Sequence, residues 1–406
     1  MRRSGVLLLL VALLGAGMQP AAVAATTDAR QRQARATLTW TQRLTSIIGD
    51  RPFSVVVGQD GEVWYRHRGW VLRPPASNEK LLLSMALLDR FHANRTIHTD
   101  ARTDGTVVDH VLHGNLWIVG HGDPETNGRS LGRLAAAIRD AGIRRIAGAV
   151  IGGIGPFSRD WFAPGWKSYF PTYYVPLPTA LTYRANTDDA GRHITDPERR
   201  AAVVLTGALA DRKIHVRDDP ASAALPGGLS VVASIRSAPL SEIMRRMNLD
   251  SRNFSAEVLG KYLGFTKTGQ GTIAAGAAAI CGFIARHHID FDCYDNSGLS
   301  YDNRASADGV LALLFIADRH PWAAVLQDTL PHAGEGTLEG RLAGVTVRAK
   351  TGTLDHVSAL SGWIWTDQGG VVEFSILSSN FDELDAKAIE DQLVQVIAAR
   401  ALDPTP

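Results

Sequence analysis

The sequence predicts an α+β fold, in which an antiparallel sheet packs with a cluster of helices and a smaller α+β domain is inserted. Residues 53–69, "FSVVVGQDGEVWYRHRG", place Asp-Gly between two strand-like runs, which is typical of a β-hairpin. Helical patterns dominate from about residue 237, and three strand-like runs beginning at residue 345 precede a last helix. Strands from both ends of the chain are therefore expected to join one sheet.

The first 25 residues have the pattern of a secretory signal peptide. Arg2 and Arg3 precede the apolar run "GVLLLLVALLGAG", and the small residues "AAVAA" follow, so cleavage is expected near Ala24 or Ala25. An uncleaved anchor is the alternative, although the apolar run is short for a span of about 20 residues. No other segment is long and apolar enough to cross a bilayer, so we expect export to the periplasm or the extracellular cell envelope.

Composition bounds the class of protein. The chain has 406 residues, of which 45% are hydrophobic and 20% charged, as expected for a globular protein with a sizeable core. A formal net charge of +1 gives no electrostatic case for binding nucleic acid. The histidines lack metal-ligand spacing such as His-Glu-x-x-His, and the sequence predicts neither a metal site nor another cofactor.

The pattern along the chain predicts two domains after the leader. Residues 26–98 and 237–406 are expected to form one domain, with a first helix beginning near Ser77. Residues 99–236 have short strand-like runs, two helical runs and many Gly and Pro turns, so they are expected to form the inserted α+β domain. The helices expected elsewhere cover residues 239–248, 254–263, 272–287, 305–318 and 385–401.

Two cysteines, Cys281 and Cys293, lie on either side of a predicted helix end and turn. An even number of cysteines in an exported protein is compatible with a disulfide. Two buried thiols are the alternative.

The segment Ser77-Asn78-Glu79-Lys80 carries the first possible catalytic pair. In a helix that begins at Ser77, Lys80 lies one turn on and on the same face. A partly desolvated lysine amine can lose its proton and act as the base for a serine hydroxyl. The alternative is ordinary helix chemistry, because serine is a favoured N-cap residue.

The segment Ser251-Arg252-Asn253 lies between two predicted helices. Its hydroxyl could relay a proton and its amide could hold a substrate amide. A helix–helix turn with capping side chains explains the same residues equally well.

The tripeptide Lys-Thr-Gly occurs twice. Lys350-Thr351-Gly352 lies on a strand-like run, where Gly352 leaves room for another backbone and the N–H of Thr353 could serve as an oxyanion donor. Lys267-Thr268-Gly269 follows a helix expected to end near residue 264, so it is predicted to lie in a solvent-facing connection. The copy at Lys350 is therefore the functional candidate.

Ser-x-x-Lys, Ser-x-Asn and Lys-Thr-Gly in this order form the motif set of penicillin-recognising serine acyl-transferases. The sequence resembles the class C low-molecular-mass penicillin-binding proteins, the D-alanyl-D-alanine carboxypeptidase/endopeptidase family. The resemblance spans about residues 70 to 380 and includes "PPASNEKLL", "LWIVGHGDP", "YDNSGLSYDN" and "LPHAGEGTLEGRL". One departure is Arg252, where the family usually has Asp.

The resemblance implies a penicillin-binding transpeptidase-like (serine β-lactamase-like) fold and a reaction on peptidoglycan stem peptides. Ser77 would form an acyl-enzyme, Lys80 would take its proton, and Ser251 with Lys350 would pass a proton to the leaving amine. The substrate-binding residues would be Asn253, Thr351, Gly352 and Thr353. β-Lactams would acylate Ser77 in the same way.

Two other functions remain open from the sequence. A β-lactamase or esterase on the same fold would need fast deacylation, for which no separate carboxylate motif is evident. A non-catalytic envelope-binding protein would keep the pocket and turn over little, but Ser77, Lys80, Ser251 and Lys350 are all present.

Overall fold

The computed structural model describes residues 38–366 and 370–399. The predicted signal peptide lies outside these residues. Within the described residues, no helix combines the length and the apolar character needed to cross a membrane.

The first sheet has five antiparallel strands in the order β12-β13-β14-β1-β2. Strand β1, near the start of the chain, pairs with β14, near its end, and Phe53 lies opposite Ser378. The N-terminal hairpin and the C-terminal strands therefore share one sheet, as the sequence predicts. The strand bounds are β1 Phe53–Gln59, β2 Glu62–His67, β12 Thr346–Leu354, β13 Val357–Trp365 and β14 Val371–Ser379.

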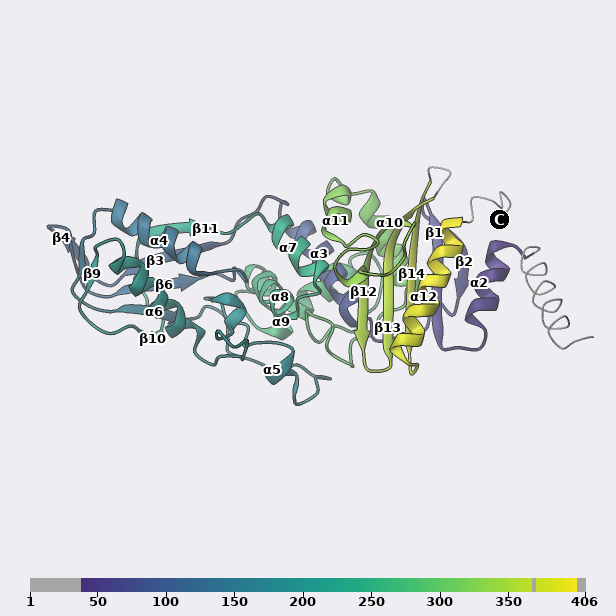
Figure 1. Ribbon diagram of the computed structural model, residues 1–406, viewed down its shortest axis with the longest axis horizontal. Helices are drawn as coiled ribbons and strands as arrows, with labels where there is room; N and C mark the ends of the chain where they lie inside the picture. Colours follow the sequence, from purple (N-terminus) through teal and green to yellow (C-terminus); the bar gives the residue numbers. More distant parts are fainter. Residues whose placement is uncertain (1–37, 367–369, 400–406) are drawn as a thin grey trace, which may run out of the picture.

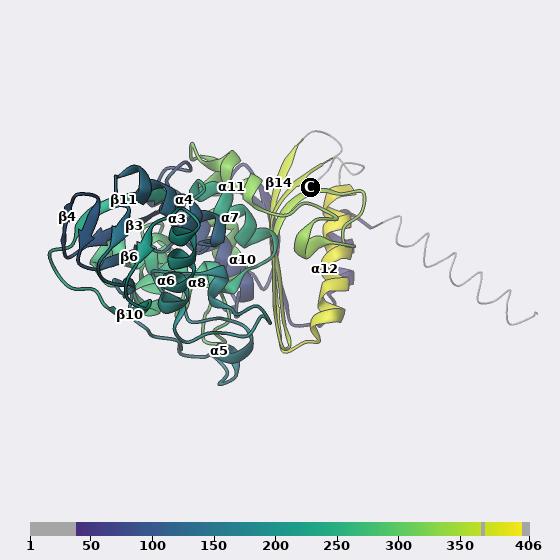
Figure 2. The same cartoon turned by 60° about the vertical axis from the view of Figure 1, so that its left-hand side comes forward.

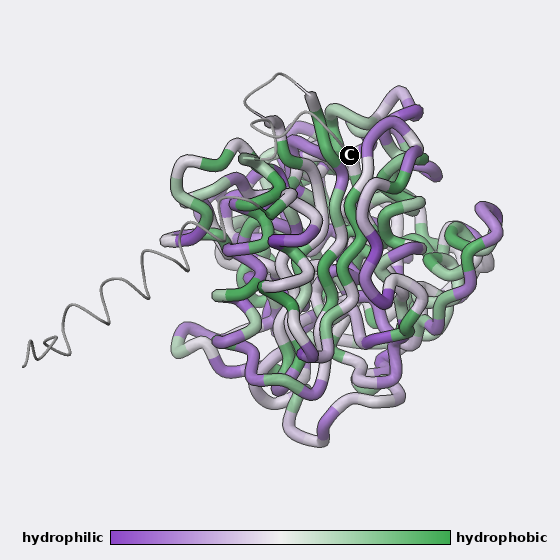
Figure 3. The backbone as a smooth tube through the Cα atoms, turned by 90° about the vertical axis from the view of Figure 1, so that its right-hand side faces the viewer, coloured by the Kyte–Doolittle hydropathy of each residue, from purple (hydrophilic) through white to green (hydrophobic). Residues whose placement is uncertain are grey.

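Both faces of this sheet are covered. Alternate residues of a strand point to opposite faces, so Val55 and Val57 pack with helices α2 (Trp40–Ile48) and α12 (Glu383–Ala398). Val56 instead packs with side chains of α10 (Ala307–Asp318) on the opposite face. Figure 2 shows α12 on the outer face of the sheet and α10 on the opposite side. Figure 3 shows the apolar strands running through the middle of that end of the molecule.

The helical cluster lies between the first sheet and the rest of the protein (Figure 1). Its central helix is α3, of which Glu79 through Leu88 are all buried, as expected for a helix surrounded by other elements. The helix bounds are α3 Glu79–Arg90, α7 Leu240–Leu249, α8 Asn253–Thr268, α9 Ile273–Ala285, α10 Ala307–Asp318 and α11 Ala323–Thr329.

The predicted end of α8 is wrong. The helix continues to Thr268 and ends at Gly269, whose φ of +77° is the left-handed conformation that favours glycine. Gly264 does not stop the helix. A Cβ at Gly264 would lie 2.7 Å from the backbone of Ala275, so the glycine permits close packing against α9. The short helices α2 and α11 were not expected from the sequence.

The second sheet, in the order β10-β8-β6-β3-β11, is flanked by α4 (Gly128–Asp140) and α6 (Pro197–Ala210). A further small sheet has the order β4-β5-β7-β9. The bounds of the remaining elements are β3 His98–Thr103, β4 Thr106–Val108, β5 Val111–His113, β6 Leu116–Gly120, β7 Arg145–Ile146, β8 Val150–Ile154, α5 Phe170–Tyr173, β9 His215–Val216, β10 Ala221–Ala224 and β11 Ser230–Arg236.

We propose the domain division of residues 26–98 with 237–406, and 99–236. Two observations support it. A separate hydrophobic core, from Ala101 to Ile214, fills the space between the second sheet and its two helices. These elements also lie at the opposite end of the long axis from α2 and α12 (Figure 1).

A disulfide joins Cys281 near the end of α9 to Cys293. It connects this helix to the segment that precedes "DNSGLS", which lies beside the candidate site described below.

Candidate active site

Ser77 lies where a 3-10 turn, Ala76–Asn78, leads into α3. The backbone at this point is tightly enclosed, and Ala76 has a φ of +46°. A Cβ at Gly298 would lie 1.9 Å from the carbonyl oxygen of Ala76, and one at Gly352 would lie 2.7 Å from that of Pro75. The expectation that Gly352 permits another backbone to approach is thus confirmed, and that backbone is the one preceding Ser77.

Lys80 is fully buried beneath Ser77. Its Nζ donates to Ser77 Oγ at 2.9 Å, to Asn253 Oδ1 at 2.8 Å and to the carbonyl oxygen of Ser297 at 2.5 Å. Burial lowers the pKa of Lys80 to about 8, although nearby carboxylates, Asp295 first among them, oppose this shift. The amine is therefore held against the hydroxyl and is much easier to deprotonate than an exposed lysine.

Ser251 lies in the turn between α7 and α8, and Asn253 is the first residue of α8. Lys350 Nζ, on β12, donates to Ser251 Oγ at 3.1 Å and to the carbonyl oxygen of Thr351 at 3.0 Å. Burial, assisted by the positive charge of Lys80, holds the pKa of Lys350 well below its usual value. The three motifs, far apart in the sequence, thus meet around Ser77: Lys80 binds Ser77 and Asn253, and Lys350 binds Ser251.

A cavity of about 490 Å³ opens in front of these residues. Ser77, Ser251, Asn253, Thr351 and Thr353 line it, while Lys80 and Lys350 lie buried beneath. The cavity is also lined by residues that the sequence did not single out, namely Tyr169, Phe170, Tyr174, Leu299, Tyr301, Thr337, Arg341, Leu354, Asp355, Glu383 and Lys387.

Thr337 contacts a predicted binding residue directly, because Thr351 Oγ1 donates to Thr337 Oγ1 at 2.8 Å. Its position in "GEGTLEGRL" gave no motif for this role. Asp355, at the turn after β12, forms an ion pair of 2.6 Å with Lys167.

Glu257 is a buried carboxyl group that sequence reasoning missed. It accepts hydrogen bonds from the backbone N–H groups of Asn296 and Ser297, at 3.1 and 2.9 Å. Burial raises its pKa to about 7, and the charge of Asp295 acts in the same direction. Glu257 thereby fixes the loop whose carbonyl oxygen contacts Lys80. The available signal was a charged residue on the apolar face of α8, one turn after Asn253.

Asp295 supports the same loop. Its carboxylate accepts from the N–H groups of Gly298 and Ser300, at 2.9 Å each, and from Trp166 Nε1 at 2.7 Å. Trp166 is therefore a buried anchor of this loop. The second copy of Lys-Thr-Gly lies in and after the last turn of α8, where Lys267 is exposed and outside the cavity lining.

Comparisons with known proteins agree with this geometry. A family model described as "D-Ala-D-Ala carboxypeptidase 3 (S13) family" matches residues 52–190 and 174–400. The D-alanyl-D-alanine carboxypeptidase of Actinomadura sp. (strain R39) is 26% identical, with 87% of this chain and 82% of that protein covered. The carboxypeptidase DacB of Mycolicibacterium smegmatis is 28% identical, with 81% and 76% covered.

The fold is also similar to solved structures. Penicillin binding protein 4 of Haemophilus influenzae superposes with a TM-score of 0.76 at 19% identity, with 88% of this chain and 98% of that chain covered. The α+β, penicillin-binding fold expected from the sequence is confirmed. Because the family model covers most of the sequence, this chain belongs to the D-Ala-D-Ala carboxypeptidase 3 (S13) family.

Proposed function

We propose that this chain is a serine D-alanyl-D-alanine carboxypeptidase/endopeptidase that acts on peptidoglycan stem peptides through a Ser77 acyl-enzyme. Membership of the family supports the reaction class. The observation that carries the assignment of residues is the hydrogen bond of 2.9 Å between the buried Lys80 amine and Ser77 Oγ.

In the proposed acylation step, neutral Lys80 takes the proton of Ser77 Oγ as that oxygen attacks the carbonyl carbon of the D-Ala-D-Ala peptide bond. A tetrahedral oxyanion forms. The N–H groups of Ser77 and Thr353 are assigned to it, and one such donor is worth ~10²–10³ in rate. Ser251 passes a proton to the leaving amine, assisted by Lys350, and terminal D-Ala departs.

The substrate is held on both sides of Ser77. Asn253 is assigned to the amide of the acyl donor, and its Oδ1 is already fixed by Lys80. Thr351 and Thr353 are assigned to the terminal carboxylate, while Gly352 keeps the strand close to the serine. Water then hydrolyses the acyl-enzyme.

A β-lactam would be attacked in the same way. Opening of its ring leaves the amine within the same molecule, so the acyl group stays on Ser77 until water removes it. The buried carboxyl groups beside the site bind backbone amides: Glu257 holds Asn296 and Ser297. This arrangement favours slow deacylation, and hence a peptidase inhibited by β-lactams over a β-lactamase or esterase.

We further propose that the protein acts outside the cytoplasmic membrane, in the periplasm or the extracellular envelope. The leader-like residues 1–25 and the location of peptidoglycan support this placement.

The proposal is tested with two substrates. A peptide that ends in D-Ala-D-Ala should release one D-Ala, and intact mass analysis after benzylpenicillin should show a stable adduct of one drug molecule. Rapid drug loss without an adduct would favour the β-lactamase. The absence of D-Ala release, adduct and drug loss would favour the non-catalytic binding protein.

The rate of acylation should depend on pH through Lys80. Only the neutral amine can accept the Ser77 proton, and burial brings the pKa of Lys80 to about 8. The second-order rate constant with benzylpenicillin should therefore rise about tenfold per pH unit below pH 7 and level off above about pH 8.

Asn253→Asp provides the matched comparison for this profile. It places a carboxylate at the atom that lies 2.8 Å from Lys80 Nζ, which should raise the pKa of Lys80 and move the profile to higher pH. A rate that does not change between about pH 6 and 9 in the unaltered protein would contradict the role of Lys80 as the base.

A further inference from the structure

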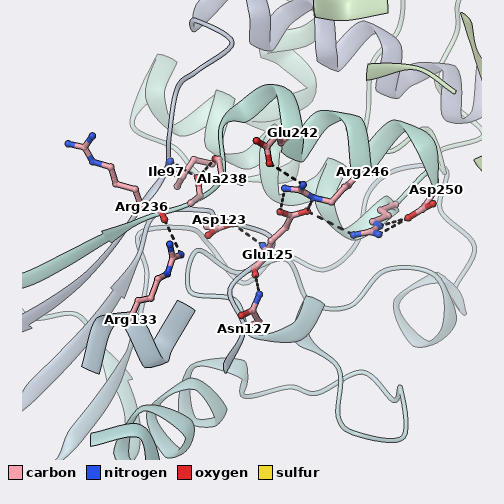
Figure 4. A network of polar contacts seen from close by, with 12 residues as sticks. Ile97, Asp123, Glu125, Asn127, Arg133, Arg236, Ala238, Glu242, Arg246 and Asp250 are labelled. Carbon is pink, nitrogen blue, oxygen red and sulfur yellow. Dashed lines mark hydrogen bonds and ion pairs between the residues drawn. The ribbon is translucent and has the colours of Figure 1, made fainter. Parts of the chain in front are cut away.

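Glu125 belongs to the proposed inserted domain, residues 99–236, and lies beside the turn that carries Ser251. It follows β6, and its backbone is fixed on both sides. Its N–H donates to Asp123 Oδ1 at 2.9 Å, and its carbonyl oxygen accepts from Asn127 Nδ2 at 3.0 Å. Asn127 in turn caps helix α4. The Glu125 side chain is thus aimed from a rigid base toward α7 (Figure 4).

The carboxylate of Glu125 binds Arg246 with two hydrogen bonds. Arg246 Nε and Nη2 lie 2.6 Å from Oε1 and Oε2, respectively. Charge-assisted, bidentate pairs of this kind are among the stronger hydrogen bonds in proteins. The exposed fractions of the two side chains are 22% and 36%, so the pair is partly shielded from solvent.

A second arginine approaches from the other side of the turn. Arg252 Nη1 lies 4.0 Å from Glu125 Oε1, while Arg252 Nε and Nη2 bind Asp250 at 2.9 and 2.6 Å. Figure 4 shows the side chain of Glu125 directed toward Arg246. The Glu125 carboxylate therefore faces two guanidinium groups: that of Arg246, before the α7–α8 turn, and that of Arg252, at its end.

This turn is strained and is part of the candidate active site. Ser251 has a φ of +55°, a conformation that serine adopts only when its surroundings hold it there. The N–H of Arg252 closes the turn on the carbonyl oxygen of Met247 at 2.9 Å. A shift of the turn would move Ser251 from Lys350 and Asn253 from Lys80.

We propose that Glu125 is a positioning residue, which holds the α7–α8 turn through Arg246 and Arg252 and so keeps Ser251 and Asn253 in place for acylation of Ser77. The proposal rests on the proposed function for its consequence in the reaction. Glu125 does not line the cavity in front of Ser77, so its part in that reaction is indirect and passes through the position of the turn.

The test compares Glu125→Ala and Glu125→Gln with Glu242→Gln. Glu242 also contacts Arg246, at 3.4 Å, but lies within α7 and not across the turn. Glu125→Ala should reduce the rate constant for acylation by benzylpenicillin at least about tenfold, since small misplacements of reacting groups have effects of this size. Glu125→Gln should have a smaller effect, and Glu242→Gln should stay within about twofold of the unaltered protein.

Amide hydrogen exchange gives a readout that does not depend on activity. Exchange in residues 247–256 should be faster in Glu125→Ala and unchanged in Glu242→Gln. If exchange is faster in Glu125→Ala but the unaltered protein is not acylated at all, the proposed function fails, while the proposal that Glu125 holds the turn stands. Unchanged exchange in both Glu125 variants would overturn the proposal that Glu125 holds the turn. If Glu125→Ala does not fold, Glu125→Gln alone still allows this measurement.

A double-mutant cycle separates positioning from a general structural role. If Glu125 acts through the turn, Glu125→Ala should have a smaller effect in a Ser251→Ala protein than in the unaltered protein, because the part that acts through Ser251 is already lost. Effects that multiply in full in the double variant would show that Glu125 acts elsewhere and would overturn the proposal.

Discussion

Ser77→Ala should abolish the benzylpenicillin adduct and lower D-Ala release by at least ~10³-fold, because no other atom can form the acyl-enzyme. Among the described residues, Ser77 is the hydroxyl that both lines the cavity and contacts the Lys80 amine. The change removes one oxygen atom at a half-buried position, so the midpoint of thermal unfolding should change little.

Ser306→Ala is the matched control for this variant. Ser306 also lies at the start of a helix, where its hydroxyl caps α10 by accepting from the N–H of Gly309 at 3.1 Å. Its loss should cost about 1 kcal/mol of stability and leave acylation unchanged. An adduct that persists in Ser77→Ala would disprove the proposed nucleophile.

Lys350→Met should reduce the acylation rate by ~10² or more, because Ser251 loses the amine that we propose assists proton transfer to the leaving group. Lys350 Nζ lies 3.1 Å from Ser251 Oγ and is fully buried. Methionine fills much of the same space without the amine. Intact mass after timed exposure to benzylpenicillin measures the rate, and thermal unfolding checks that the variant is folded.

The control for Lys350→Met is the same change at Lys267, in the other Lys-Thr-Gly tripeptide. Lys267 has the same two following residues, but it is exposed in the last turn of α8. Lys267→Met should therefore leave acylation within about twofold of the unaltered protein. Equal losses in both variants would mean that the effect of Lys350→Met does not come from its contact with Ser251.

The order of motifs identified the candidate site more securely than any single motif did. Ser-x-x-Lys and Ser-x-Asn each had an ordinary explanation as helix caps, and Lys-Thr-Gly occurred twice. The alternating apolar residues around Lys350 predicted a strand, and β12 runs through it. The helical spacing from Ser77 to Lys80 predicted their contact, since residues three apart lie on one face.

Other parts of the site had no sequence signal of their own. Thr337 reaches Thr351 because a 3-10 turn packs beside β12, and Glu257 acts through backbone amides forty residues away. The role of Glu125 depends on two arginines that are more than a hundred residues further along the chain. Such contacts are fixed by how elements pack, which a linear pattern does not encode.

Most of the elements, and the chemistry available to them, follow from the sequence. Periodicity gave the hairpin, most helices and the terminal strands, because apolar side chains must face a core in register with the backbone repeat. It did not predict the end of α8, because a glycine can either end a helix or allow two helices to pack closely, and Gly264 does the second.

Which groups lie together, and how acidic each one is, depends on how the elements pack. Lys80, Lys350 and Glu257 have ordinary side chains, and their pKa values shift because packing removes them from water. The same packing leaves Lys267 in solvent. Burial and distance are properties of the assembled fold, so they separate two identical tripeptides that the sequence could distinguish only by their local setting.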